Sequence, residues 1–311
     1  MGAIRIGTRE SQLALWQALQ VQELLNARGH ATEIVPIKSE GDIDLQTPLY
    51  EIGVQGIFTR TLDASLLAGL IDLAVHSMKD VPTKLATGIT QAAVLKRGPV
   101  SDLIVLKGDD VVESYDRHDS DDQPRWIVAT SSIRRMAQWL NRFPGDSIVS
   151  LRGNVNTRLR KLRQENWNAA IFAQAGLERI GLRPVNSIVL DWMLPAPAQG
   201  AIVAVCREND DRVAEICRQF NDDETARCTA IEREFLRTLL GGCSTPISAY
   251  ARVIDERLLF SGNIVSPDGR QKFEIEKNVA LNASDSLGAQ AAHEILAQGA
   301  TVITEAIRHA D

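Results

Sequence analysis

Short hydrophobic runs alternate with helical patterns through the first two thirds of the chain. Runs such as 4–8 (IRIGT) and 71–77 (IDLAVHS) predict buried strands. The segments 10–29 and 155–164 repeat apolar residues three and four positions apart, which predicts amphipathic helices. The same patterns predict further strands at 32–38, 126–130, 147–151 and 169–174, and further helices at 57–70, 132–143 and 176–181. The order indicates an α/β fold with two doubly wound, mostly parallel lobes.

Two proline-containing breaks divide this pattern, at 96–102 (KRGPVSD) and 194–201 (LPAPAQGA). A lone strand, 202–206, follows the second break, so we expect it to return to the first lobe. After about 220 a long helix is followed by alternating strands and a final helix, which predicts a small α+β domain. The predicted domains are 1–98 with 198–217, then 99–197, and finally 218–311. Two lobes joined by two crossings are expected to leave a ligand cleft between them.

Composition narrows the functional classes. The 311 residues are 44% hydrophobic and 24% charged, with a net charge of −6, so binding of nucleic acid by bulk electrostatics is not expected. No apolar run reaches the roughly 18 residues that span a bilayer, and the first residues lack the pattern of a signal peptide, so we expect no membrane contact and a cytoplasmic location. The acidic segment 108–124 predicts a solvated surface insertion.

Polar residues follow four of the predicted strands, where strands lead into helices. They are Thr8, Arg9 and Ser11, then His76, Ser77, Lys79 and Asp80, then Thr130, Ser131, Ser132, Arg134 and Arg135, and finally Arg152, Asn154, Thr157 and Arg158. Helix capping alone explains Ser11 or Ser131, but a cation is disfavoured at a helix N-terminus. Arginines at these positions therefore indicate a site for an anionic ligand with several charged groups. Lys79 and Asp80 form either a structural ion pair or part of an acid–base site.

The four cysteines fall into two groups. Cys206, Cys217 and Cys228 lie in apolar strand or helix patterns and are expected to be buried, and their spacing indicates no metal site. Cys243 instead lies in a loop between a glycine pair and a proline, LLGGCSTPISAY. Two classes fit these features: an enzyme that uses Cys243 covalently, and a binding protein of the periplasmic-receptor type in which the cysteine is incidental. The third domain and the absence of a signal peptide favour the enzyme.

Seven segments, in order, resemble the porphobilinogen deaminase (hydroxymethylbilane synthase) family. They are IRIGTRESQLALWQA, DLAVHSMKDVPT, VATSSIRR, LRGNVNTRLRKL, AGLERIGL, AQGAIVAVCR and GGCSTPISAYA. The resemblance implies three domains, the first two like type II periplasmic binding proteins.

The resemblance also implies the reaction. The family joins four porphobilinogen molecules into the linear tetrapyrrole hydroxymethylbilane and releases ammonia at each addition. The growing polypyrrole chain starts from a dipyrromethane cofactor, which is held by a thioether at the position of Cys243. No metal is implied. We expect a monomer that hands its product to the next enzyme of the pathway.

The resemblance assigns roles to individual residues. Asp80 matches the catalytic carboxylate, and Phe58 and Gln199 match a substrate-stacking position and a hinge position. The positions that match cofactor-binding residues are Lys79, Asp80, Thr130, Ser131, Ser132, Arg134, Arg135 and Arg158. The positions that match substrate-binding residues are Arg9, Ser11, Phe58, Arg152, Arg158, Arg179 and Gln199.

Overall fold

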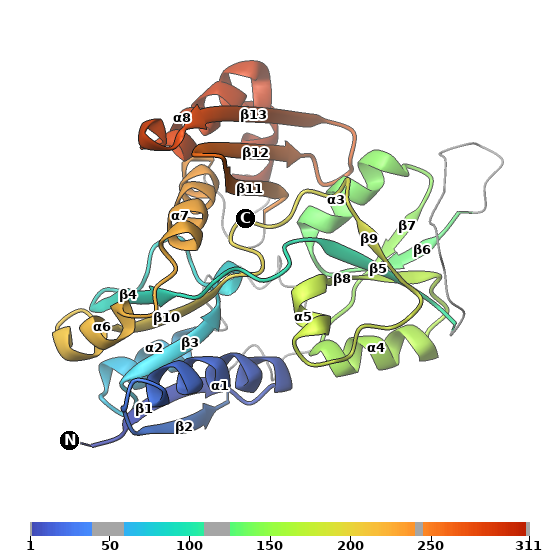
Figure 1. Ribbon diagram of the computed structural model, residues 1–311. Helices are drawn as coiled ribbons and strands as arrows, with labels where there is room; N and C mark the ends of the chain where they lie inside the picture. Colours follow the sequence, from blue (N-terminus) through green and yellow to red (C-terminus); the bar gives the residue numbers. More distant parts are fainter. Residues whose placement is uncertain (1, 39–58, 109–124, 240–244, 309–311) are drawn as a thin grey trace.

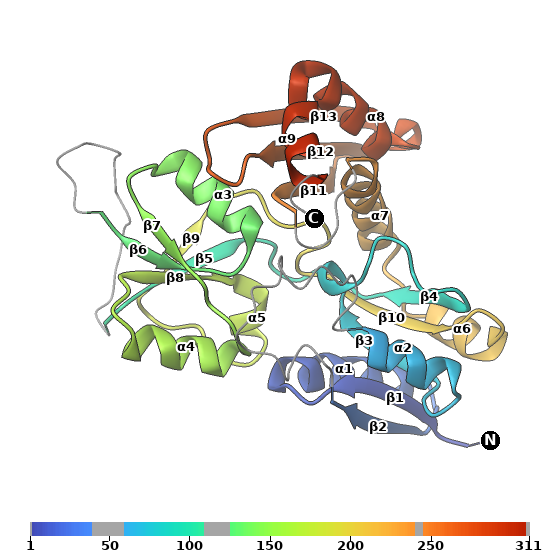
Figure 2. The same ribbon diagram turned by 180° about the vertical axis from the view of Figure 1, so that it is seen from behind.

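The computed structural model describes residues 2–38, 59–108, 125–239 and 245–308. Within these ranges two five-stranded sheets lie side by side, and a third domain packs against both (Figures 1 and 2). The predicted insertion at 108–124 lies almost wholly outside the described residues, as do Phe58 and Cys243.

The first sheet has the order β2-β1-β3-β10-β4 and carries helices on both faces. Its strands are β1 (Ile4–Arg9), β2 (Thr32–Ile37), β3 (Leu73–Ser77), β4 (Ile89–Val94) and β10 (Ile202–Arg207), and its helices are α1 (Gln12–Asn26), α2 (Arg60–Leu67) and α6 (Asp211–Arg218). Residues of α1 and α6, among them Val21 and Val213, pack on one face. Leu62 and Leu66 of α2 cover the other. Successive side chains of the strands point to opposite faces and so contribute to two hydrophobic cores, one on each face of the sheet.

The second sheet repeats this plan with the order β7-β6-β8-β5-β9. Its strands are β5 (Asp102–Leu106), β6 (Ile127–Ala129), β7 (Ser147–Val149), β8 (Ala169–Ala173) and β9 (Ser187–Leu190), and its helices are α3 (Ile133–Arg142), α4 (Val155–Gln164) and α5 (Gln174–Glu178). Trp139 and Phe143 form the core beneath α3, with ring centroids 4.8 Å apart. Leu162 and Leu177 form the core beneath α4 and α5.

Both sheets are mixed, and in each the single strand that runs antiparallel to the others follows a crossing between the lobes. β10 runs antiparallel between β3 and β4, and β5 runs antiparallel between β8 and β9. The other four strands of each sheet point the same way. The prediction of two doubly wound, mostly parallel lobes is therefore confirmed, and the lone strand after the second break does return to the first sheet.

The third domain is built on a three-stranded antiparallel sheet, as expected for a small α+β unit. Its elements are α7 (Asp223–Thr238), β11 (Ile247–Ile254), β12 (Arg257–Val265), β13 (Lys272–Ala280), α8 (Leu287–Ile295) and α9 (Thr301–Arg308). Phe235 of α7 packs on Phe260 of β12, with ring centroids 5.2 Å apart. The domain boundaries at 98, 198 and 217 stay predictions.

The two crossings meet at a close backbone contact. The first crossing, 95–101, links β4 to β5, and the second, 191–201, links β9 to β10. The N–H of Gly98 donates to the carbonyl of Gly200 at 3.0 Å. A Cβ at Gly200, where φ is +86°, would lie 2.7 Å from the carbonyl oxygen of Gly98, so glycine is required there.

A buried carboxylate joins the third domain to both crossings. Glu232 of α7 is fully buried and accepts two hydrogen bonds from the guanidinium of Arg97, at 2.6 and 2.9 Å. It also accepts from the backbone N–H groups of Ala198, at 2.6 Å, and Ala251, at 2.7 Å. Arg97 belongs to the first crossing, Ala198 to the second and Ala251 to β11, so one side chain ties three segments together.

Removal of this charge should destabilise the fold strongly. We expect Glu232→Gln to lower the free energy of unfolding by about 3–5 kcal/mol, because it leaves the buried Arg97 guanidinium without its counter-ion. Urea unfolding followed by circular dichroism measures the change. The matched control is Glu178→Gln, in a half-exposed pair with Arg183 at 2.7 Å, which should cost at most about 1 kcal/mol. Similar losses in the two variants would contradict the assigned role of Glu232.

Candidate active site

Charged residues of both lobes lie close together at the carboxyl ends of the strands. Arg9 ends β1, and Lys79 and Asp80 lie in a single 3₁₀ turn directly after β3. In the second lobe Arg135 occupies the first turn of α3, and Arg158 the first half of α4. The sequence predicted this convergence because parallel strands present their carboxyl ends at one edge.

The electrostatics of Arg158 show that the two lobes face one another here. Burial lowers the pKa of Arg158 to about 10, and the positive charges of Arg135 and Arg152 act in the same direction. The carboxylate of Asp80 opposes this shift, and the cation of Arg9 adds to it. Arg9 and Asp80 belong to the first lobe, whereas the three other arginines belong to the second, so the predicted cationic residues share one site.

Lys79 lies in the same site. Burial lowers the pKa of its ammonium group to about 8; the nearby cation of Arg135 contributes, while the Asp80 carboxylate opposes the shift. Its Nζ donates to Oε1 of Gln199 at 3.3 Å. Gln199 lies in the second crossing, so the turn that carries Lys79 and Asp80 is in direct contact with the junction between the lobes.

Asp102, at the start of β5, was not singled out in the sequence. Its fully buried carboxylate accepts hydrogen bonds from Arg134 at 2.6 Å and from Arg135 at 2.8 Å. It also accepts from Nε2 of Gln199 at 2.9 Å. Burial alone would raise the pKa of Asp102, but the two guanidinium groups hold it well below its usual range. No local sequence pattern relates Asp102 to arginines that lie 32 and 33 residues further along the chain. Asp102 is nevertheless the last residue of the break 96–102.

The two arginines of α3 are aligned by backbone carbonyls as well. Arg134 donates to the carbonyl of Leu194 at 2.7 Å, and Arg135 donates to that of Ile171 at 2.9 Å. The Nε–H groups of both side chains are buried and have no hydrogen-bond acceptor within the described part of the chain. Asp102 and the carbonyls thus bind both terminal nitrogens, Nη1 and Nη2, of each guanidinium.

The hydroxyl groups serve local structure. Ser11 caps α1 by accepting from the N–H of Ala14, and Ser132 caps α3 by accepting from the N–H of Arg135. Capping therefore explains Ser11, as expected, whereas the cap of α3 is Ser132 and not Ser131. Ser131 instead accepts from the N–H of Leu151 at 2.8 Å.

Thr130, Arg152 and Arg158 of the second lobe also make local contacts. The hydroxyl of Thr130 accepts from the N–H of Ser132 at 3.2 Å. Arg152 is buried beside Arg158, whose Nε donates to the carbonyl of Gly153 at 2.7 Å.

Arg179 lies at the second crossing, where it contacts both lobes. It donates to the carbonyl of Gly200 at 2.6 Å and stacks over the ring of Trp16, whose centroid is 5.5 Å away. Burial lowers its pKa to about 10. The site roles of Arg179 and of the other arginines stay predictions.

The charge balance of this site fits a ligand with several carboxylates. Six cations, namely Arg9, Lys79, Arg134, Arg135, Arg152 and Arg158, interact with one another and with the two carboxylates Asp80 and Asp102. Burial lowers the pKa values of Lys79 and Arg158, and the neighbouring cations add to both shifts. A bound polycarboxylate would restore the charge balance.

The cysteines of the described residues are all structural. Cys206, Cys217 and Cys228 are buried, as predicted, and burial raises their thiol pKa values to about 11, 12 and 12. Such thiols are poor nucleophiles. Within the described ranges no three histidine, cysteine, aspartate or glutamate side chains lie close enough to hold a metal ion.

His76 is a buried titratable group beside this site. Its side chain projects from β3, its Nε2 has no hydrogen-bond partner among the described residues, and burial lowers its pKa to about 4, with the Arg9 charge adding to the shift. Between about pH 6.5 and about pH 4 the unfolded chain binds a proton here that the folded chain does not. Folding stability must therefore fall as the pH falls through this window.

We expect the wild-type protein to lose on the order of 2–3 kcal/mol of unfolding free energy through His76 between about pH 7.5 and about pH 4.5. Denaturant titrations at several pH values measure this loss. His76→Gln, which cannot become charged, should flatten that part of the profile, whereas His293→Gln, at an exposed position, should leave it unchanged. Parallel profiles for the wild type and His76→Gln would refute the assignment.

Fold and site together define a two-lobed α/β protein in which cations of both lobes lie around one carboxylate, Asp80, an arrangement that fits a polyanionic ligand. Two family models match the chain: "Porphobilinogen deaminase, dipyromethane cofactor binding domain" over residues 4–215, and "Porphobilinogen deaminase, C-terminal domain" over residues 226–297. The chain therefore belongs to the porphobilinogen deaminase family, and its activity is porphobilinogen deaminase (hydroxymethylbilane synthase) activity in tetrapyrrole biosynthesis.

Curated relatives agree over nearly the whole chain. A porphobilinogen deaminase of Syntrophotalea carbinolica is 39% identical over 310 residues, which cover 98% of this chain and 96% of the relative. A chloroplastic porphobilinogen deaminase of Oryza sativa subsp. japonica is 41% identical over 307 residues, 95% of this chain and 84% of the relative.

Among solved structures, the second substrate-binding domain of a putative amino acid ABC transporter from Streptococcus pneumoniae aligns with a TM-score of 0.44. The alignment is 10% identical and covers 70% of this chain and 91% of that one. A score of this size is too low to bear on the fold or the function.

Proposed function

We propose that this chain joins four porphobilinogen molecules into hydroxymethylbilane on a dipyrromethane primer attached to Cys243, with Asp80 as the catalytic carboxylate. The observation that carries the proposal is the site between the lobes, where cations of both lobes surround Asp80. Each pyrrole ring of the substrate carries two carboxylates, so a growing chain needs a row of arginines of this kind.

The arginines and Lys79 bind and orient carboxylates in this proposal. Arg134 and Arg135 are held in fixed directions by Asp102 and by backbone carbonyls, so little side-chain entropy is lost when a carboxylate binds. Arg9, Arg152 and Arg158 extend the same positive surface. Carboxylate binding also stabilises the charged form of Lys79, whose pKa is low in the free chain.

Asp80 stabilises the positive charge that develops when ammonia leaves the substrate and hydrogen-bonds the pyrrole N–H. The 3₁₀ turn after β3 holds Asp80, and the N–H of Met78 in this turn donates to the carbonyl of Ala201 at 3.0 Å, which supports such a role. A fixed carboxylate in a partly dehydrated site stabilises such a cation far better than water does. The same oxygen atoms can accept the proton that the new ring loses.

The primer supplies the first acceptor carbon for chain growth when it is bound. Its acidic side chains fit the cofactor positions matched in the sequence, namely Lys79, Ser131, Ser132, Arg134 and Arg135. Two further parts of the proposal rest on residues outside the described ranges: attachment at Cys243 and ring stacking by Phe58. Arg179 and Gln199, which match substrate-binding positions, form hydrogen bonds to the backbone of the two crossings, at Gly200 and Val100.

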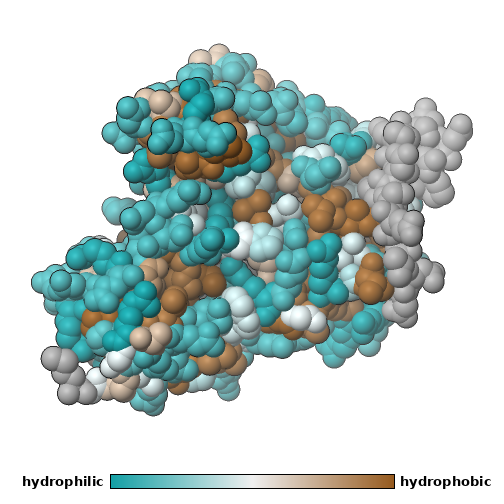
Figure 3. Space-filling view, viewed as in Figure 1, coloured by the Kyte–Doolittle hydropathy of each residue, from teal (hydrophilic) through white to brown (hydrophobic). Residues whose placement is uncertain are grey.

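A monomer that passes its product to the next enzyme completes the proposal. Figure 3 shows the hydrophobic residues of one face in several separate patches among hydrophilic ones. No helix in the described part of the chain combines the length and hydrophobicity needed to cross a membrane. A cytoplasmic location stays a prediction, and one relative is chloroplastic.

Asp80→Asn should retain the fold and lower kcat by about 10²–10³-fold, because the amide cannot stabilise the cation or accept the proton. Ammonia release in a steady-state assay measures the effect. Asp255→Asn is the matched control, since Asp255 is exposed in a turn with φ of +48° that asparagine tolerates well. Turnover near the wild-type level in Asp80→Asn would remove Asp80 from the mechanism.

The intact mass of the purified protein should exceed that of the polypeptide by two pyrrole units, and Ehrlich's reagent should detect them. Cys243→Ser should have the bare polypeptide mass, because no other cysteine is accessible as a thiolate in the described residues. Cys228→Ala, a buried position on α7, should keep the added mass. A bare mass for wild-type protein would contradict attachment of the primer at Cys243.

A further inference from the structure

Arg233 of α7 binds the turn that carries the proposed catalytic carboxylate. One guanidinium nitrogen, Nη1, donates to the carbonyls of Met78, at 3.2 Å, and Val81, at 2.9 Å. The other, Nη2, donates to the carbonyl of Pro82 at 2.6 Å. These acceptors lie on both sides of Lys79 and Asp80, so a single side chain of the third domain brackets the turn.

The turn needs such support because it is intrinsically weak. The 3₁₀ helix Met78–Asp80 has only three residues. It is closed by a hydrogen bond from the N–H of Val81 to the carbonyl of Met78, at 3.2 Å. Such short helices have poor hydrogen-bond geometry and leave carbonyls without partners. Arg233 supplies donors to three carbonyls in and just after this turn, and Ala201, the residue before β10, accepts from the N–H of Met78 at the other end.

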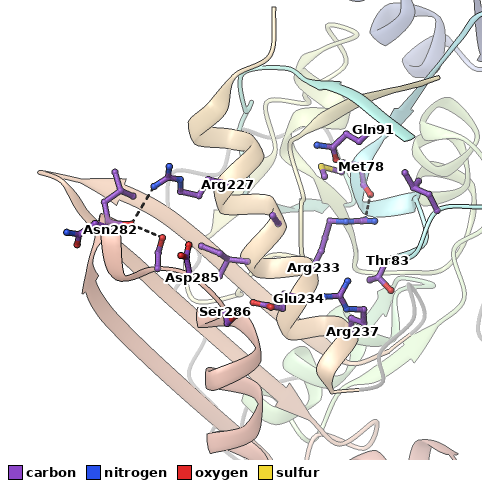
Figure 4. Close-up of a pocket in the computed structure, with 15 residues that line it drawn as sticks. Met78, Thr83, Gln91, Arg227, Arg233, Glu234, Arg237, Asn282, Asp285 and Ser286 are labelled. Carbon is purple, nitrogen blue, oxygen red and sulfur yellow. Dashed lines mark hydrogen bonds between the residues drawn. The ribbon is translucent and has the colours of Figure 1, made fainter. Parts of the chain in front are cut away.

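Arg233 reaches the turn from a cavity that is separate from the cationic site. The cavity has a volume of about 650 Å³ and lies between α7, the turn and the segment 281–286; its lining includes Met78 and Thr83 but neither Lys79 nor Asp80. Figure 4 shows Arg233 extending from α7 toward Met78, whereas Arg227 on the same helix points toward Asn282. Because exposed residues such as Arg237 line the cavity, small ions in solvent can reach Arg233.

We propose that Arg233 is a positioning residue, which fixes Asp80 relative to the helix that leads to the cofactor-bearing loop. The helix α7 ends at Thr238, and Cys243 follows five residues later. Arg233 thus links the catalytic carboxylate to the domain from which the product grows. This inference rests on the roles proposed above for Asp80 and Cys243.

Removal of the guanidinium should loosen the turn and leave substrate binding intact. We expect Arg233→Ala to lower kcat by about 10²-fold, because displacement of a catalytic group by about 1 Å costs that much. KM should stay within about threefold, since the carboxylate-binding arginines are unchanged, and the two-pyrrole mass should be retained. Arg227→Ala is the matched control, because Arg227 lies on the same helix and lines the same cavity but makes one long contact, at 3.5 Å, to the carbonyl of Leu281.

Two further measurements separate positioning from general stabilisation. Guanidinium ion, added far below unfolding concentrations, should restore part of the kcat of Arg233→Ala and leave Arg227→Ala unchanged. The double variant Asp80→Asn/Arg233→Ala should be no slower than Asp80→Asn alone, because Arg233 acts through Asp80.

The outcomes distinguish this inference from the proposed function. A wild-type kcat in Arg233→Ala, or losses that multiply in the double variant, would overturn the positioning role while a slow Asp80→Asn still supports the function. A fully active Asp80→Asn would overturn both. If Arg233→Ala does not fold, Arg233→Lys decides the matter: a lower kcat with unchanged KM and unchanged unfolding midpoint supports positioning, and a loss of stability with wild-type kcat refutes it.

Discussion

The buried carboxylate of Asp102 is the interaction on which the organisation of the site depends. Two guanidinium groups and the amide of Gln199 share its two oxygen atoms. Without it, Arg134 and Arg135 would place two positive charges side by side in a dehydrated space, at a cost of several kcal/mol. With it, the arginines are neutralised in part and held in one direction. The site can therefore be strongly cationic and still belong to a stable fold.

Buried charges occupy central places at the junctions between the domains. Asp102 ends the first crossing and contacts the second through Gln199, and Glu232 links both crossings to the third domain. Ion pairs and hydrogen bonds require particular geometries, so they restrict the relative orientation of the lobes more than an apolar interface would. Under the proposed function, a ligand carboxylate that enters between the lobes meets the same guanidinium groups that maintain this orientation.

Much of this molecule follows from local sequence, and the remainder depends on distant contacts. The helices over 12–26 and 155–164, the strand pattern and the convergence of strand ends were all predictable, because periodicity reports burial. Strands β4, β5 and β9 were not predicted; β4 and β5 lie on either side of the proline-containing break 96–102. Helix α5 begins two residues earlier than predicted. The roles of Asp102, Glu232 and Arg97 could not be predicted because their hydrogen-bond partners are up to 154 residues away in the sequence.

The antiparallel insertion of β10 between β3 and β4 constrains how the protein is made. Residues 202–207 leave the ribosome only after every strand of the second lobe. Until then the first sheet consists of β2, β1 and β3, with an open edge at β3 and no neighbour there for β4. Open strand edges invite incorrect pairing. The amino-terminal lobe is thus completed only after at least 207 of the 311 residues have been synthesised, and its edge at β3 stays open until then.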